Sequence, residues 1–110
     1  MLKTLILITP ILAISLSGCI SDPLVGKGPI KLSPNTQAGF EEYQKEFKPG
    51  HFAVAVNGGA YSYNYCRGRC TKSSKMHSIH RCEQYSDGVP CKIYGAKGKV
   101  VWDRDAGANS

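Results

Sequence analysis

The stretch that decides the fold is FAVAVNGGAYSYNYC, residues 52–66. Apolar or aromatic side chains alternate on both sides of Asn57-Gly58, and an Asn-Gly pair between two alternating runs is the strongest short-range signal of a β-hairpin. The returning run places Tyr61, Tyr63 and Tyr65 on one face. We expect these tyrosines to face the core, because so small a domain must build its core from the large side chains it has. If they were exposed, they would stack on a sugar ring or fill a pocket of a partner.

A short amphipathic helix is predicted before this hairpin. Ser33 is a suitable N-cap, and Pro34 occupies the first helical position. Phe40, Tyr43 and Phe47 follow at helical spacing, until Lys-Pro-Gly at 48–50 ends the run.

A second helix and a second hairpin are predicted after it. Thr71 caps a helix that runs to about Tyr85, with an inner face of Met76, Ile79 and Cys82. The second hairpin has strands at 91–94 and 100–102 and a turn around Lys97-Gly98. The sequence therefore predicts one α+β domain of order α-β-β-α-β-β, in which two hairpins form an antiparallel sheet and the second helix packs on it.

The first eighteen residues are typical of a secretory signal peptide. Lys3 precedes an apolar run that contains Pro10 and is too short to cross a bilayer. Leu16-Ser17-Gly18-Cys19 then resembles the lipobox of bacterial lipoproteins, in which the cysteine receives a diacylglycerol before the chain is cut in front of it. We expect a signal peptide at 1–18, an acylated flexible tether at 19–32, the α+β domain at 33–103 and a polar tail at 104–110.

Acylation of Cys19 also explains the number of cysteines. The chain has five, and an exported chain with an odd number needs a use for the fifth. Several fatty acyl chains on one cysteine give a stable membrane anchor. Ile20 stands where an aspartate would retain an enterobacterial lipoprotein in the inner membrane, so the resemblance implies the periplasmic face of the outer membrane.

The remaining four cysteines allow three pairings. Local geometry favours Cys66–Cys70 across a five-residue loop and Cys82–Cys91 between the second helix and the next strand. The alternative is a zinc site drawn from these cysteines with His77 and His80. Disulfides are the preferred interpretation, because exported thiols normally pair, and we expect no metal, no cofactor and no catalytic residue. His77 and His80 are interpreted as part of a solvated helix face.

The exported domain is basic. The whole chain has a formal charge of +6, and loss of Lys3 with the signal peptide leaves +5. Such a surface attracts anionic envelope material, whereas export argues against nucleic acid as a partner. Five cations cluster in the middle third of the chain and are the candidate binding residues: Arg67, Arg69, Lys72, Lys75 and Arg81.

From Phe52 onward the chain resembles an uncharacterised group of small exported proteobacterial proteins and lipoproteins. The shared features are Phe52-Ala53-Val54, the Asn57-Gly58 turn, Tyr61 to Cys66, Cys82, Cys91 to Tyr94 and Val100 to Trp102. It is distantly similar to DUF4189-type domains, in which a cysteine that ends a helix precedes a Cys-Lys strand. The resemblance supports the fold and the Cys82–Cys91 bridge and implies no activity.

The sequence thus predicts a membrane-anchored, non-enzymatic binding or structural module. Its basic face would meet an anionic component such as lipopolysaccharide or peptidoglycan, or an envelope protein. One alternative is a metal- or thiol-dependent periplasmic enzyme that uses His77, His80 and the cysteines. Another is a small inhibitor of a cell-wall hydrolase, although a basic inhibitor is poorly matched to a basic lysozyme.

Overall fold

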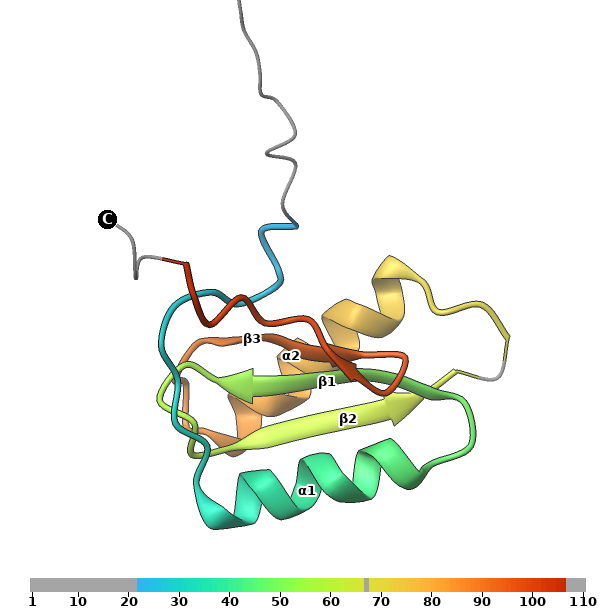
Figure 1. Ribbon diagram of the computed structural model, residues 1–110. Coiled ribbons are helices and arrows are strands. Elements are labelled where there is room, and N and C mark those ends of the chain that lie inside the picture. Colours follow the sequence, from blue (N-terminus) through green and yellow to red (C-terminus); the bar gives the residue numbers. More distant parts are fainter. Residues whose placement is uncertain (1–21, 67, 107–110) are drawn as a thin grey trace, which may run out of the picture.

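The computed structural model describes residues 22–66 and 68–106 of the chain. Its elements follow the predicted order α-β-β-α-β-β and confirm the α+β class (Figure 1). They are α1 (Pro34–Lys45), β1 (Pro49–Ala55), β2 (Tyr61–Tyr65), α2 (Lys72–Tyr85), β3 (Cys91–Ala96) and β4 (Lys99–Val100).

The four strands form one antiparallel sheet in the order β2-β1-β3-β4. The two predicted hairpins meet along β1 and β3, where Ala53 lies between Ser62 and Ile93. Being central, β1 is buried along nearly its whole length. The first turn is longer than a two-residue hairpin turn, because β1 ends at Ala55 and β2 begins only at Tyr61.

The face of the sheet covered by α1 is an aromatic core. Phe40 and Tyr43 of α1 pack against Phe52 of β1, with ring centroids 5.1 and 5.3 Å from that of Phe52. Tyr61 and Tyr63 stack on the same Phe52 ring. Two of the three alternating tyrosines therefore face the core as expected, whereas Tyr65 at the end of β2 is exposed.

The opposite face of the sheet is covered by α2. Ile79 and Cys82 pack on the small side chains of Ala53 and Ala55, which let the helix approach closely. The prediction that Met76 lies on this inner face is wrong, since its side chain is 44% exposed. The buried side chains of α2 are those of Ser78, Ile79 and Cys82, which form a narrow face of the helix. Met76, three positions before Ile79, lies at the margin of this face.

Phe47 is a second correction, because it is not part of the core. Helix α1 ends at Lys45, Glu46 is extended, and Lys48 has a positive φ of 54°. The chain turns away before Phe47 can continue the helical face, and its ring is left 82% exposed.

Residues 22–32, which we call the strap, are a third correction. They were predicted as flexible tether but are part of the domain, running beside β3 where the two-residue β4 leaves its edge open. The N–H of Ile93 donates to Leu24 O at 2.8 Å, and the N–H of Gly26 donates to Ile93 O at 3.1 Å. Four apolar side chains of the strap pack against the two cores: Leu24, Val25, Ile30 and Leu32.

The end of the domain also differs from the prediction. Only Lys99–Val100 pairs as β4, and Trp102 lies beyond it, held by an Nε1–H that donates to Gly28 O of the strap at 2.8 Å. Arg104, predicted as tail, donates to the hydroxyl of Tyr94 and lies over its ring. Within the described residues, none of the helices combines the length and apolar character needed to cross a bilayer.

Candidate functional site

Both predicted disulfides are present. Cys66 pairs with Cys70 before α2 begins, and Cys82 in the last turn of α2 pairs with Cys91 of β3; the Cα–Cα distances are 5.3 and 6.1 Å. With both bonds formed, none of these four cysteines is a free thiol that could serve the alternative zinc site. His77 and His80 are exposed on α2, as expected of a solvated helix face.

A polar cluster lies beneath the Cys66–Cys70 disulfide, between β1, β2 and α2. His51 of β1 is 7% exposed, and its Nδ1 lies 3.2 Å from the hydroxyl of Ser74 on α2. That hydroxyl lies 3.2 Å from Asn64 Oδ1 and 3.8 Å from Cys66 Sγ. Asn64 also accepts a hydrogen bond from the N–H of His51 and donates one to Ser74 O, each at 3.0 Å. Two strands and a helix thus meet around one imidazole.

His51 also lines a cavity of about 400 Å³ that opens to solvent between the strap and α2. Its walls come from Asp22, Pro23, Leu24, His51, Cys70, Thr71, Lys72 and Lys75. Lys75 forms a hydrogen-bonded ion pair with Asp22, so the first described residue of the strap is fixed to α2.

Two groups in this cavity have shifted pKa values. The pKa of Asp22 is lowered, chiefly because its carboxylate accepts a hydrogen bond from Lys75 and a second from the N–H of Leu24. Burial lowers the pKa of His51; the charge of Lys75 lowers it further, and Asp22 acts in the opposite direction. Near neutral pH the cavity therefore holds a neutral imidazole beside a carboxylate and two ammonium groups.

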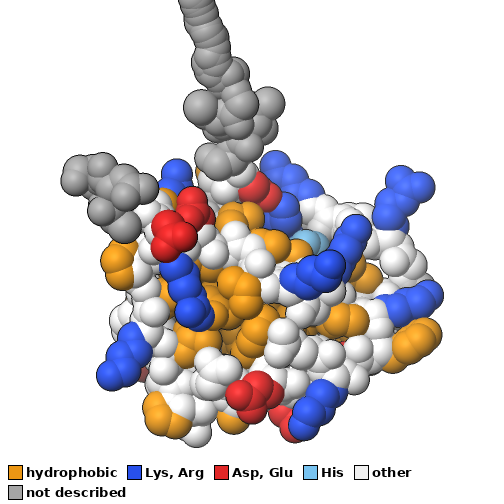
Figure 2. Space-filling model, viewed as in Figure 1, with side chains coloured by type: hydrophobic (Ala, Val, Ile, Leu, Met, Phe, Trp, Pro, Cys, Tyr) orange, Lys and Arg blue, Asp and Glu red, His pale blue; other side chains and the backbone are white. Residues whose placement is uncertain are grey.

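A second cavity, of about 480 Å³, lies on the other side of the same disulfide. It is lined by Lys48, Pro49, Cys66, Gly68, Arg69, Cys70 and Lys97. Cys70 belongs to both cavities, which are thus adjacent. We call the cations of the two cavities the basic site: Lys48, Arg69, Lys72, Lys75 and Lys97. Figure 2 shows Lys and Arg side chains in blue along the upper and right-hand side of this face, with a histidine among them.

The structure brings together three of the five predicted binding residues, Arg69, Lys72 and Lys75. Arg81 is separate: nine residues after Lys72, it lies about 14 Å further along the helix and donates to the hydroxyl of Tyr85 at 2.7 Å. It lines a different cavity, beside Tyr61 and Tyr63. Arg67 and the lipidation residue Cys19 lie outside the described residues.

His51, Asn64 and Ser74 were not predicted as site residues. A partial signal existed, since Asn64 alternates with the tyrosines of β2 and therefore points to the face opposite the aromatic core. His51, in contrast, stands beside an apolar run, and only the packing of α2 gives it polar neighbours.

Comparison with known proteins gives no match: no family model, no curated protein and no solved structure is similar to this chain.

Proposed function

We propose that this protein is a bacterial envelope lipoprotein, anchored through Cys19, whose domain binds anionic groups at the membrane surface through the basic site. The supporting observation is the position of Asp22, which lines the basic site and is only three residues from Cys19 in the sequence. Three extended residues span at most about 11 Å. In this proposal, the part of the basic site that Asp22 lines, with Lys72 and Lys75, is therefore close to the anchor.

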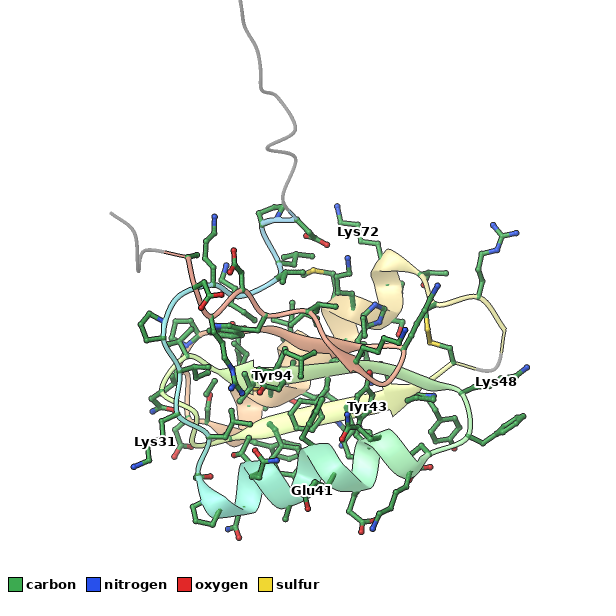
Figure 3. All side chains as sticks on the ribbon, viewed as in Figure 1. Lys31, Glu41, Tyr43, Lys48, Lys72 and Tyr94 are labelled. Carbon is green, nitrogen blue, oxygen red and sulfur yellow. A yellow bond between two sulfur atoms is a disulfide. The ribbon has the colours of Figure 1, made fainter. Side chains whose placement is uncertain are left out.

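This arrangement differs from the one the sequence predicted. A flexible tether of a dozen residues would let the domain turn any face toward the bilayer. Because the strap is packed, only the short link from Cys19 to Asp22 separates the anchor from the domain. Figure 3 shows Lys72 on the side where the described chain begins, with Lys31 far from it.

Electrostatics favours contact at this separation. The Debye length is about 8 Å at physiological ionic strength, similar to the reach of the link. Each Lys or Arg near an anionic membrane contributes about 1 kcal/mol of attraction. Lys72 and Arg69 are exposed and form no ion pair within the described residues, so their charges are available to phosphates. We further propose, from Ile20, that the membrane is the outer membrane and that the domain lies on its periplasmic side.

Vesicle binding by the mature chain tests this function. An unacylated Cys19→Ser form would be sedimented with vesicles that contain phosphatidylglycerol and with vesicles of phosphatidylcholine alone. We expect salt-sensitive retention on the anionic vesicles only. Lys72→Glu exchanges one attraction for one repulsion and should weaken retention at least about fivefold.

Lys31→Glu is the matched control, since it makes the same charge change at an exposed position remote from the basic site. An equal loss for both variants would mean that only net charge matters and would refute the site. Retention on isolated peptidoglycan but not on vesicles would move the proposal from lipid phosphates to cell-wall carboxylates.

The enzyme hypothesis gains no support from these residues. His77 and His80 are exposed, and Cys82, the cysteine nearest to them in sequence, is in a disulfide. The hydrolase-inhibitor hypothesis likewise finds no feature of the described residues in its favour.

A further inference from the structure

Three potential metal ligands converge where β1, β2 and the start of α2 meet. Within residues 22–66 and 68–106, His51, Cys66 and Cys70 form the one group of three His, Cys, Asp or Glu side chains whose ligand atoms all lie within 4.8 Å of one another. In the oxidised protein the two sulfurs are bonded to each other. A disulfide is a poor metal ligand, because thiolates are what bind.

We propose that the Cys66–Cys70 disulfide is reducible in the folded protein, and that the reduced form binds a thiophilic cation through Cys66, Cys70 and His51. This metal site does not depend on the membrane anchor, because all three ligands are residues of the domain. It also differs from the zinc site considered from the sequence, which was drawn from the four cysteines with His77 and His80 and did not include His51.

The hydrogen bonds around His51 determine which of its ring nitrogens carries the proton and which is left able to bind a metal ion. Asn64 Oδ1 is identified as the acceptor atom because it receives the N–H of His51, while Asn64 Nδ2 donates to Ser74 O. The Ser74 hydroxyl therefore donates to Asn64 Oδ1, and its oxygen accepts the proton of His51 Nδ1. Nε2 keeps its lone pair. A metal-binding histidine usually donates its other ring N–H to such a hydrogen-bond acceptor, which fixes the tautomer.

The two disulfides differ in how easily a reductant can reach them. Cys82 and Cys91 are buried, at 0% and 3% exposure, between α2 and the sheet. Cys70 is partly exposed and lines both cavities of the basic site. It also directly precedes Thr71, the N-cap of α2, where the helix dipole and the cations Arg69 and Lys72 stabilise a thiolate. A stabilised thiolate is a better leaving group, which favours reduction at this bond.

The reaction requires an exported dithiol as electron donor. Its thiolate attacks one sulfur of the Cys66–Cys70 bond, which breaks as a mixed disulfide forms. The second thiol of the donor then attacks the donor's own sulfur in the mixed disulfide. This forms a disulfide within the donor and releases the second protein thiol. Two electrons and two protons pass to the protein, and the metal ion displaces the two thiol protons when it binds.

Two thiolates and one imidazole define the class of cation. Zn²⁺ takes such ligands in tetrahedral geometry, with a water in the fourth position. Cu⁺ is selected by the same soft sulfur ligands. The 400 Å³ cavity beside His51 and Cys70 offers room for the water that Zn²⁺ would need. A spacing of three residues between Cys66 and Cys70 falls within the usual range for two ligands of one zinc ion.

The first experiment is graded reduction of the native mature chain, followed by alkylation and peptide mapping. We expect Cys66 and Cys70 to be labelled at dithiol concentrations that leave Cys82 and Cys91 unlabelled. Simultaneous opening of both disulfides, or earlier opening of Cys82–Cys91, would overturn the proposal.

The second experiment titrates the reduced, desalted chain with Zn²⁺ and, separately and without oxygen, with Cu⁺. We expect the reduced chain to bind one equivalent of Zn²⁺, one equivalent of Cu⁺, or, in the separate titrations, one equivalent of each. The oxidised chain and the double variant Cys66→Ser/Cys70→Ser should bind neither ion. Co²⁺ should give a sulfur-to-metal charge-transfer band. His51→Gln should weaken binding at least tenfold while Cys82–Cys91 stays closed, and His80→Gln, on the exposed face of α2, should not weaken it. Equal binding by His51→Gln and the parent, or no binding by the reduced parent, would refute the site.

Discussion

Gly26 is the position at which the packing of the strap can be tested with one added methyl group. A Cβ at Gly26 would lie 2.0 Å from Cζ3 and 2.1 Å from Cε3 of Trp102. Carbon atoms pack at about 3.5–4.0 Å, so either the indole or the strap must move by about 1.5 Å or more. The indole is rigid and nearly buried, and it also packs against the ring of Tyr94.

The expected loss of stability follows from what such a movement would break. Displacing a buried tryptophan costs about as much as truncating it, about 3–5 kcal/mol. The hydrogen bond from Trp102 Nε1 to Gly28 O contributes about another 1 kcal/mol. Small domains have a total stability of about 5–15 kcal/mol, so Gly26→Ala should bring this one close to unfolding.

Denaturant unfolding of the oxidised protein measures this loss, and the only tryptophan of the chain, Trp102, reports on the very contact that is changed. Gly68→Ala is the matched control, because a Cβ there meets no atom within 4 Å; it should alter stability by less than about 0.5 kcal/mol. If Gly26→Ala also changed stability by less than about 0.5 kcal/mol, the strap would not be packed on Trp102. The sequence-based interpretation of these residues as a free tether would then be correct.

Two further predictions concern buried polar groups. The Tyr43 hydroxyl donates to Gly50 O at 2.7 Å and accepts from the N–H of Gly98 at 3.0 Å. Tyr43→Phe should therefore lower the free energy of unfolding, measured with denaturant, by about 1–3 kcal/mol. An equally large loss for Tyr65→Phe, whose ring is exposed, would contradict this. The pKa of His51, which Lys75 and Asp22 face, lies below its ordinary value of 6.5, so the unfolded chain binds more protons between the two values. The contribution of neutral His51 to the free energy of unfolding should therefore be complete above about pH 6.5 and be lost as the pH falls through the pKa of the folded state. In a plot of unfolding free energy against pH, His51→Gln should flatten this part of the curve.

Local patterns in the sequence were enough to predict the element order and both disulfides. Alternation around Asn57-Gly58 predicts a hairpin whatever packs on it, and the short spacings of the cysteines favour the pairs that form. These signals are local, because each depends on residues within one or two elements.

The strap could not be predicted in this way. Its prolines and glycines are typical of a linker, and its place beside Ile93 exists only because β4 stops after Val100 and leaves the edge of β3 unpaired. The length of one strand thus decides the structure of a segment some seventy residues away in sequence. Phe47 shows the opposite error: helical spacing suggested that it is buried, but the helix ends at Lys45 and the extended backbone of Glu46 leaves the Phe47 ring exposed.

Only part of the candidate site could be predicted from the sequence, because some of its residues are brought together by tertiary contacts. Arg69, Lys72 and Lys75 are close in sequence and stay close in the fold, so a charge cluster found them. Their neighbours Asp22 and His51 come from the strap and from β1 and are brought there by tertiary contacts alone. Arg81 was grouped with them by sequence, but about two and a half turns of helix separate it from Lys72.

The proposed attachment of the chain to a membrane through Cys19 is the central claim, because the proposed function needs a short link from Cys19 to Asp22 to hold the cavity that Asp22 lines near the lipid. The most direct test is the intact mass of the protein extracted with detergent from the membranes of cells that express the full chain. We predict a species that begins at Cys19 and carries a diacylglycerol and an amide-linked fatty acid, and that is absent in Cys19→Ser. A chain that keeps residues 1–18, or one that begins near Cys19 with an unmodified thiol, would contradict the account.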